Sequence, residues 1–306
     1  MLVMEHLWIA IVLVAAALQT ARNAGQKYLS GHLSALAATW IRFVFGLPFA
    51  VLYLFIVTDF SSFKLDILNQ NFLLPCALAA LCQLSGTAFL ILLFRLRNFA
   101  IGSTYVRTEV LIAAFIGTFF FDEFVSPMGW VAIFISVSGV IIISVVKFNI
   151  GTRNSLKNFF DVSAGIGLLS GLGFALGSFF IREASLSFKE DNFLLTAAIT
   201  LVVVISFQTI GLGFYILLKQ PGQFQAILKF WRPSVFVGFT SAVGSIGWFT
   251  AMTIQRIAYV KALAQIEFIF ALLLSILLFG EKPTRQELIG MSLVAIGIVI
   301  LVLFVK

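Results

Sequence analysis

The stretch from Glu109 to Glu123, EVLIAAFIGTFFFDE, recurs 158 residues later from Glu267 to Glu281 as EFIFALLLSILLFGE. Outward from this pair, residues 75–145 match residues 233–303 without a gap and at the same spacing. The matched positions include Pro75 with Pro233, Gly86 with Gly244, Glu109 with Glu267, Glu123 with Glu281 and Gly139 with Gly297. Such residue types rarely align by chance in a background rich in Leu, Ile, Val and Phe. Internal symmetry of this kind is typical of a membrane transporter built from two halves.

Composition places the chain in a membrane. Of its 306 residues 61% are hydrophobic and 11% are charged, whereas a soluble domain carries about 25% charged residues. The net charge is +7, but the basic residues are scattered over short loops, so we expect no binding of nucleic acid. Cys76 and Cys82 lie six residues apart on one predicted helix and suit neither a disulfide nor a metal site.

Hydrophobic runs divide the chain into candidate membrane spans. A hydrocarbon core about 30 Å thick requires about 20 apolar residues per helix. Ten such runs occur, at residues 7–28, 33–57, 72–94, 99–120, 128–147, 162–182, 193–217, 233–254, 258–279 and 285–305. We therefore predict an all-α integral membrane protein with ten transmembrane helices. Because five is odd, two sets of five helices are inverted relative to each other if the chain crosses at every run. The predicted repeats are residues 1–147 and 161–306, joined by a linker at 148–160.

Several residues mark helix ends or bends. Ser126 before Pro127 is typical of a helix start, and the spacing of Thr284 and Glu287 predicts a capping box. Pro48, inside the second run, predicts a kink.

A family resemblance follows from the order of these features. The segments that end at Glu123 and Glu281 are each followed, sixteen residues on, by a glycine of the next helix, Gly139 or Gly297. With Gln265-Ile266-Glu267-Phe268, this order resembles the EamA-type pattern of the drug/metabolite transporter superfamily over nearly the whole chain. Two features depart from that pattern: the family often has proline where Val110 and Phe268 stand, and the first copy has Asp122 where the second has Gly280.

This resemblance implies ten helices in two inverted halves, cytoplasmic termini, a central cavity and export or exchange of small metabolites. The distribution of basic residues over the loops instead favours an outside N-terminus.

Glutamates at equivalent positions of the repeat are the candidate proton-coupling residues. An ionisable group within a membrane helix costs about 2.5–3.5 kcal/mol on insertion scales, so it requires a reason to be there. Glu109 and Glu267 each lie near the middle of a predicted helix, where an inverted pair would face a shared midplane cavity. A carboxyl group in that position can exchange a proton during transport. The alternative is a structural glutamate that binds the backbone of another helix or neutralises an arginine.

Candidate substrate-binding residues begin with arginines and amides. Arg42 has no counterpart in the second half, so it is a natural partner for a substrate carboxylate or phosphate, with snorkelling or a salt bridge to Glu109 as the alternative. A polar stripe in the first run is expected to line water or substrate, with a hydrogen-bonded seam between helices as the alternative. Its members recur at three and four residues: Gln19, Arg22, Asn23 and Gln26.

Single polar and aromatic residues complete the candidate site. Gln83 and Gln208 are expected to orient a ligand or to join helices, and Tyr105 and Trp248 are expected to supply aromatic walls.

The charge balance favours a class of cargo. Arginines within the predicted helices, Arg22, Arg42 and Arg107, outnumber Glu109 and Glu267, which suits zwitterionic or anionic cargo such as amino acids. We therefore predict a secondary transporter that exports or exchanges such metabolites by alternating access, with possible proton coupling. A multidrug exporter of lipophilic cations is the alternative, and an integral-membrane enzyme or a receptor is a remote one.

Further expectations concern cofactors and surroundings. The chain carries no phosphate-binding loop, cluster of metal ligands or nucleophile motif, so we expect neither enzymatic activity nor a metal or other cofactor. The expected partners are a small-molecule substrate and the lipid bilayer. We expect the bacterial cytoplasmic (inner) membrane as the location, with the protein as a monomer or homodimer.

Overall fold

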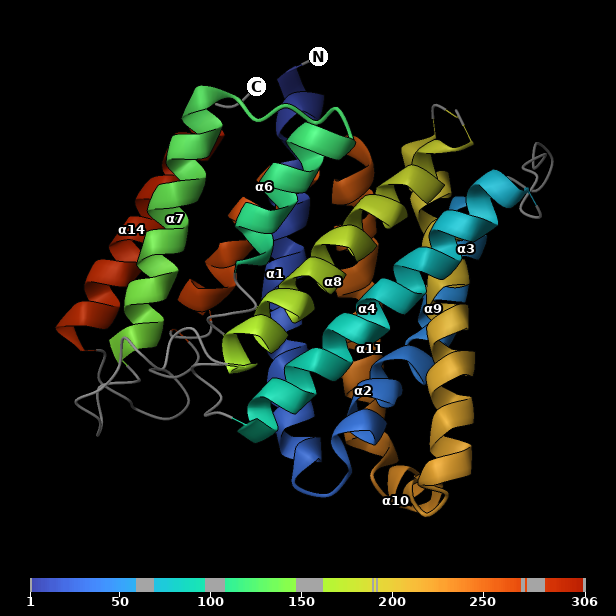
Figure 1. The fold of residues 1–306 in the computed structure, drawn as a ribbon. Coiled ribbons are helices and arrows are strands. Elements are labelled where there is room, and N and C mark those ends of the chain that lie inside the picture. Colours follow the sequence, from blue (N-terminus) through green and yellow to red (C-terminus); the bar gives the residue numbers. More distant parts are fainter. Residues whose placement is uncertain are drawn as a thin grey trace. The chain divides into compact units, whose positions relative to one another are not determined.

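The computed structural model describes residues 2–58, 69–96, 108–146, 162–188, 190, 192–270, 273 and 284–304. Every regular element in these ranges is helical, which confirms the all-α class (Figure 1). The elements are α1 (Leu2–Ser30), α2 (Ala35–Val44), α3 (Leu47–Val57), α4 (Gln70–Leu96), α6 (Glu109–Phe120), α7 (Pro127–Val146), α8 (Val162–Leu186), α9 (Phe193–Lys219), α10 (Gln223–Lys229), α11 (Trp231–Ile254), α12 (Ile257–Leu263), the 3₁₀ turn η1 (Ala264–Ile266) and α14 (Arg285–Phe304).

Helix length and hydropathy agree with a membrane-spanning chain. Within the described ranges, seven helical spans are long and apolar enough to cross a membrane, and α6 and residues 127–142 of α7 are shorter apolar helices. The seven spans are His6–Ser30, Ala35–Val57, Gln70–Leu90, Gly165–Leu186, Phe193–Lys219, Trp231–Ile254 and Arg285–Phe304. Ten crossings in two inverted halves remain a prediction.

Two predicted runs contain interrupted helices. The second run, 33–57, consists of α2 and α3, which are separated at Phe45 and Gly46 just before Pro48. Proline fixes its own φ and lacks an N–H donor, so it is tolerated in the first turn of a new helix. The predicted kink at Pro48 is therefore confirmed, as a break between two helices. In the ninth run, α12 ends at Leu263 and η1 intervenes before residue 267.

The predicted helix starts are present with their side-chain caps. The Ser126 hydroxyl oxygen accepts a hydrogen bond from the Gly129 N–H at 3.1 Å, at the start of α7. At the start of α14, the Thr284 N–H donates to Glu287 Oε2 at 2.8 Å and the Glu287 N–H donates to Thr284 Oγ1 at 3.2 Å. These reciprocal bonds satisfy donors that the first helical turn leaves without partners, and they confirm the capping box.

Asp122 has a left-handed backbone that explains one departure from the family pattern. Its φ is +53°, directly after the C-cap residue of α6. Glycine adopts this region without a steric penalty, and Asp is among the few other residues that tolerate it. The repeat aligns Asp122 with Gly280, so aspartate here replaces glycine at a position whose backbone favours glycine.

The chain divides into two compact units, and each unit draws on both halves of the sequence. Unit 1 comprises Met1–Ile9, Cys82–Phe179 and Gln255–Lys306, and unit 2 comprises Ala10–Leu81 and Phe180–Ile254.

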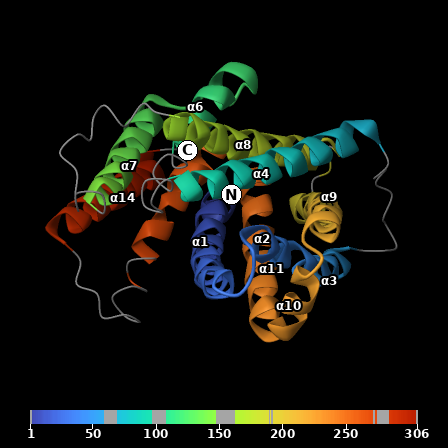
Figure 2. The same cartoon turned by 60° about the horizontal axis from the view of Figure 1, so that its bottom comes forward.

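In unit 2, helix α11 packs against α2, α3 and α9 (Figure 2). A buried cluster that includes Leu29, Ile41 and Val237 joins α1, α2 and α11. The indole N–H of Trp40 donates to the Thr209 carbonyl oxygen at 2.8 Å and so ties α2 to α9. Apolar packing with a few hydrogen bonds between helices therefore holds this unit together.

In unit 1, α7 and α14 lie side by side along their lengths (Figures 1 and 2). The two glycines that the repeat matches, Gly139 and Gly297, both lie at this contact. A Cβ atom added to Gly139 would meet the backbone of Gly290 and Val294, and one added to Gly297 would meet Ser136. Residues without a Cβ atom allow helix backbones to approach closely in a membrane.

Gly139→Ala is expected to lower the free energy of unfolding by about 1–3 kcal/mol, because the new methyl group would meet backbone atoms of α14 that cannot rotate away. The matched control is Gly211→Ala on α9, where an added Cβ meets nothing within 4 Å. The free energy of unfolding of that control is expected to rise by about 0.5–1 kcal/mol, since alanine stabilises a helix more than glycine does. Thermal unfolding in one detergent measures both variants, and equal shifts of the two midpoints would contradict the close α7–α14 contact.

Candidate functional site

Polar side chains gather at two places within the apolar helices, one in each unit. The arginine cluster of unit 2 consists of Gln19, Arg22, Asn23, Arg42 and Trp248. The glutamate–lysine pair of unit 1 consists of Glu109 and Lys261, and Gln265 lies four residues after Lys261 in the chain.

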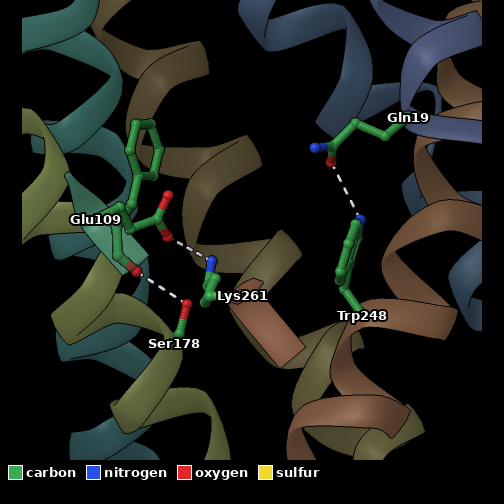
Figure 3. Close-up of polar contacts among 6 residues, drawn as sticks. Gln19, Glu109, Ser178, Trp248 and Lys261 are labelled. Atoms are coloured by element: carbon green, nitrogen blue, oxygen red, sulfur yellow. Dashed lines mark hydrogen bonds and ion pairs between the residues drawn. The ribbon is translucent and has the colours of Figure 1, made fainter. Parts of the chain in front are cut away.

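The polar stripe of α1 extends its amide side chains toward other helices of unit 2. Gln19 Oε1 accepts a hydrogen bond from Trp248 Nε1 on α11 at 3.1 Å (Figure 3). Two turns farther along α1, Gln26 Nε2 donates to the Ala38 carbonyl oxygen of α2 at 3.0 Å. Both amides therefore act in a hydrogen-bonded seam between helices, which was the alternative interpretation of this stripe. A role of Gln19 in substrate binding remains a prediction.

Arg22 is the buried charge of the stripe. Only 9% of its surface is exposed, and its Nε and Nη2 atoms donate to Asn23 Oδ1 at 3.3 and 2.9 Å. Asn23 itself is exposed. The amide oxygen of Asn23 orients the guanidinium but carries no negative charge, so this contact does not neutralise Arg22.

Arg42 is the second guanidinium of the cluster. It lies in the last turn of α2, where the helix dipole favours a cation, and its Cζ atom lies 4.7 Å from the centre of the Phe43 ring. Among the residues that the structure describes, Arg42 makes neither a hydrogen bond nor an ion pair, and its Nε atom is buried. The positive charge of Arg22 acts on Arg42, so two like charges share this part of unit 2.

In unit 1, Glu109 forms an ion pair with Lys261. Oε1 of Glu109 and Nζ of Lys261 lie 2.5 Å apart, and the side chains are 14% and 16% exposed, respectively (Figure 3). Glu109 occupies the first turn of α6 rather than the middle of a helix, where its negative charge also favours the helix N-terminus. The structural alternative for Glu109 named an arginine as the partner, and the partner is a lysine.

The loop after α6 fixes the start of α12 and thereby positions Lys261. Glu123 Oε2 accepts a hydrogen bond from the Ile257 N–H at 2.8 Å, and the Ser126 N–H donates to the Tyr259 hydroxyl oxygen at 2.9 Å. Glu123 supplies both a hydrogen-bond acceptor and a negative charge to the N-terminal turn of α12. Glu123 is only 8% exposed, so this capping contact is shielded from water.

Two further residues of this region lie on and after η1. Gln265 is 1% exposed, and neither its Nε2 nor its Oε1 has a hydrogen-bond partner among the described residues. Glu267, the second predicted proton-coupling residue, follows η1 and is 5% exposed. Its coupling role remains a prediction.

Two of the remaining predicted residues, Gln83 and Gln208, lie on other helices that the structure describes. Gln83 is half-buried on α4, and Gln208 is buried on α9 with 1% of its surface exposed. Tyr105 and Arg107 lie outside the described residues.

Sequence reasoning missed Lys261 and Gln265 as site residues. Lys261 and Glu109 are about half the chain apart in sequence, so no local spacing indicates the pair. The repeat aligns Lys261 with Ser103, and symmetry therefore gives no signal either. Gln265 had one available signal: the repeat aligns it with Arg107, which marks a polar position in both halves.

Comparisons with known proteins relate these features to a family. No curated protein matches the chain. Among the solved structures that match the chain is a crystal structure with a TM-score of 0.74 and 15% sequence identity, over 98% of this chain and 97% of the other. At that identity the likeness establishes a shared fold. The model of the EamA-like transporter family matches residues 163–303, which confirms the resemblance read from the sequence. Given this match and the apolar helices, the protein is an integral multi-pass membrane protein whose residues 163–303 are similar to the EamA-like transporter family.

Proposed function

We propose that this protein is a secondary transporter that exports or exchanges small organic metabolites by alternating access. The proposed cargo is an amino acid or a related zwitterionic or anionic compound. Its ten helices would form two inverted five-helix halves in a bacterial cytoplasmic membrane.

The observation that carries the choice of cargo is the arginine cluster. Two guanidiniums in an apolar environment repel each other, and Arg42 has no hydrogen bond or ion pair within the described part of the chain. An arginine presents a planar fork of donors that matches a carboxylate or a phosphate in a bidentate arrangement. An anionic group that bound here would offset the repulsion and satisfy the buried Nε atom. A lipophilic cation would add a third positive charge.

Alternating access is supported by the duplication and by interrupted helices. The repeat relates residues 75–145 to 233–303, and such inverted repeats generate two alternative states around one site. At Phe45 and Gly46 and at η1, the regular α-helical hydrogen-bond pattern of the backbone is interrupted. In transporters, irregular backbone of this kind is found where it lines a cavity.

Proton coupling through Glu109 is part of the proposal. A proton taken up by this carboxylate would remove the negative charge that holds Lys261. Protonation of Glu109 and cargo binding at this ion pair would therefore be linked.

The test is uptake into proteoliposomes of three labelled probes: an amino-acid panel, a monocarboxylate and a lipophilic cation, each with and without a pH gradient. Accumulation of an amino acid or a carboxylate supports the proposal, and its dependence on the gradient supports proton coupling. Transport of the cation alone by folded protein would replace this cargo class with the multidrug alternative.

A further inference from the structure

Gln265 presents a buried amide whose hydrogen-bonding capacity is unused in the described part of the chain. Its surface is 1% exposed, and both Nε2 and Oε1 are without partners there. A primary amide has two donor hydrogens and an acceptor oxygen with two lone pairs. Burial of such a group without partners is costly, so each instance in a folded protein requires an explanation. A ligand that hydrogen-bonds to this amide during the transport cycle would explain why the amide is left without partners here.

The position of Gln265 links it to the ion pair. Lys261 lies on α12 and Gln265 on η1, which follows α12 directly, so the two residues are about one turn apart along this segment. Lys261 contacts Glu109 of α6. This segment therefore carries a lysine that pairs with Glu109 of α6 and, about one turn farther along, an amide without a partner among the described residues; the charges of the three residues sum to zero.

We propose that Lys261, Glu109 and Gln265 form a subsite for the head group of a zwitterionic amino acid. The cargo carboxylate binds Lys261 and accepts a hydrogen bond from Gln265 Nε2, and the cargo ammonium group binds Glu109. This inference rests on the proposed transport function and specifies its substrate class.

Charge balance favours a zwitterion over a simple ion at this subsite. A monoanion that bound Lys261 would leave Glu109 without a counter-charge, and a cation that bound Glu109 would leave Lys261 without one. Loss of one partner from a poorly exposed ion pair is strongly unfavourable because the other charge stays desolvated. A zwitterion replaces both partners at once, so neither charge is left unpaired.

The described conformation is closed over this subsite, because Gln265 is inaccessible to solvent. Helix α14 packs against η1 and α12. In this proposal, cargo reaches the subsite when the transport cycle separates α14 from η1 and α12.

The central experiment compares Gln265→Met with the wild type. The substitution removes the amide at similar volume, so we expect the dissociation constant of a transported amino acid to rise roughly 10- to 100-fold. The thermal midpoint without ligand is expected to stay unchanged or to rise, because an unsatisfied buried polar group has been removed. A purely structural amide would instead give a lower midpoint with unchanged affinity, and that result would overturn the proposal.

Gln208→Met is the matched control for stability. Gln208 is as buried as Gln265 but has an interaction partner in the structure. Its replacement is therefore expected to lower the thermal midpoint. If Gln265→Met lowers the midpoint as much as Gln208→Met does, Gln265 has a structural partner and the subsite is rejected.

Ligand variants test the zwitterion directly. The N-acetyl derivative of the amino acid lacks the ammonium charge, and its amide derivative lacks the carboxylate. Each is expected to bind the wild type at least tenfold more weakly than the amino acid. Equal binding of either derivative would show that the corresponding charge is not recognised, and would overturn this assignment.

Binding and transport readouts separate this inference from the proposed function. Ligand binding to the folded state raises the thermal midpoint of protein in detergent, whether or not transport occurs. If amino acids raise the midpoint in a Gln265-dependent manner but are not accumulated in proteoliposomes, the subsite stands and the transport proposal fails. If amino acids are accumulated but Gln265→Met leaves their affinity unchanged, the transport proposal stands and the subsite fails.

Discussion

Arg42→Met is expected to reduce the kcat/KM of anionic or zwitterionic cargo transport about 100-fold, because a bidentate contact is lost that arginine makes with the cargo carboxylate at a separate step of transport from its binding at Lys261. The chain is expected to remain folded. Arg42 makes no hydrogen bond or ion pair with the described residues, and its removal relieves the like-charge interaction with Arg22. Initial uptake rates in proteoliposomes measure transport, and thermal unfolding in detergent measures whether the variant remains folded. Wild-type transport by folded Arg42→Met would exclude Arg42 from cargo binding.

Two further variants separate the charge of Arg42 from its shape. Arg42→Lys keeps the positive charge but loses the planar fork, so its transport rate is expected to lie between those of the wild type and Arg42→Met. Arg182→Met is the control for a structural arginine of unit 2. Arg182 Nη1 donates to the carbonyl oxygens of Met252 and Thr253 at 2.6 and 2.9 Å, near the end of α11. Its removal leaves acceptors without these donors and is expected to lower the thermal midpoint.

Lys261→Met and Glu109→Gln are each expected to lower the free energy of unfolding by about 3–5 kcal/mol. Each substitution leaves the partner's charge in a site that is only 14–16% exposed. The double variant is expected to recover most of this loss, since neither charge is then left unpaired. A double-mutant cycle of thermal or denaturant unfolding measures the coupling between the two residues.

Glu183→Gln is the control for this cycle, because Glu183 is an exposed carboxylate on α8. Its neutralisation is expected to change stability by no more than about 0.5 kcal/mol. If the effects of Lys261→Met and Glu109→Gln simply add, the two side chains do not form an energetically coupled pair. The cycle also supplies a folded double variant for transport measurements, in which loss of uptake both with and without a pH gradient is expected, because both residues belong to the proposed subsite.

Local sequence signals predicted the helix boundaries well. The run 128–147 corresponds to α7 at Pro127–Val146, and the run 285–305 corresponds to α14 at Arg285–Phe304. Apolar length sets the helical span, and the caps at Ser126 and Thr284 set its start. The break before Pro48 was equally readable, because the loss of one N–H donor acts within a few residues of the proline.

The polar stripe of α1 was found correctly from its spacing, but its use was only partly foreseen. Residues three and four apart share a helix face, so Gln19 and Gln26 were expected on one side. That Gln19 binds Trp248 and Gln26 binds a carbonyl of α2 depends on which helices pack against that side. A helical period identifies the members of a face and contains no information about what lies opposite them.

The sequence by itself determined the class of this protein, its internal sequence repeat, most helix limits and the resemblance to EamA-like transporters. These properties depend on hydrophobic length, local backbone preferences and residue patterns that are contiguous along the chain. Only the tertiary structure decided that Glu109 pairs with Lys261, that Arg22 acts on Arg42, and that the Gln265 amide is left without a partner in the described ranges. Such contacts join helices that are distant in sequence, and a buried charge or amide is satisfied or left unsatisfied by neighbours that no local pattern specifies.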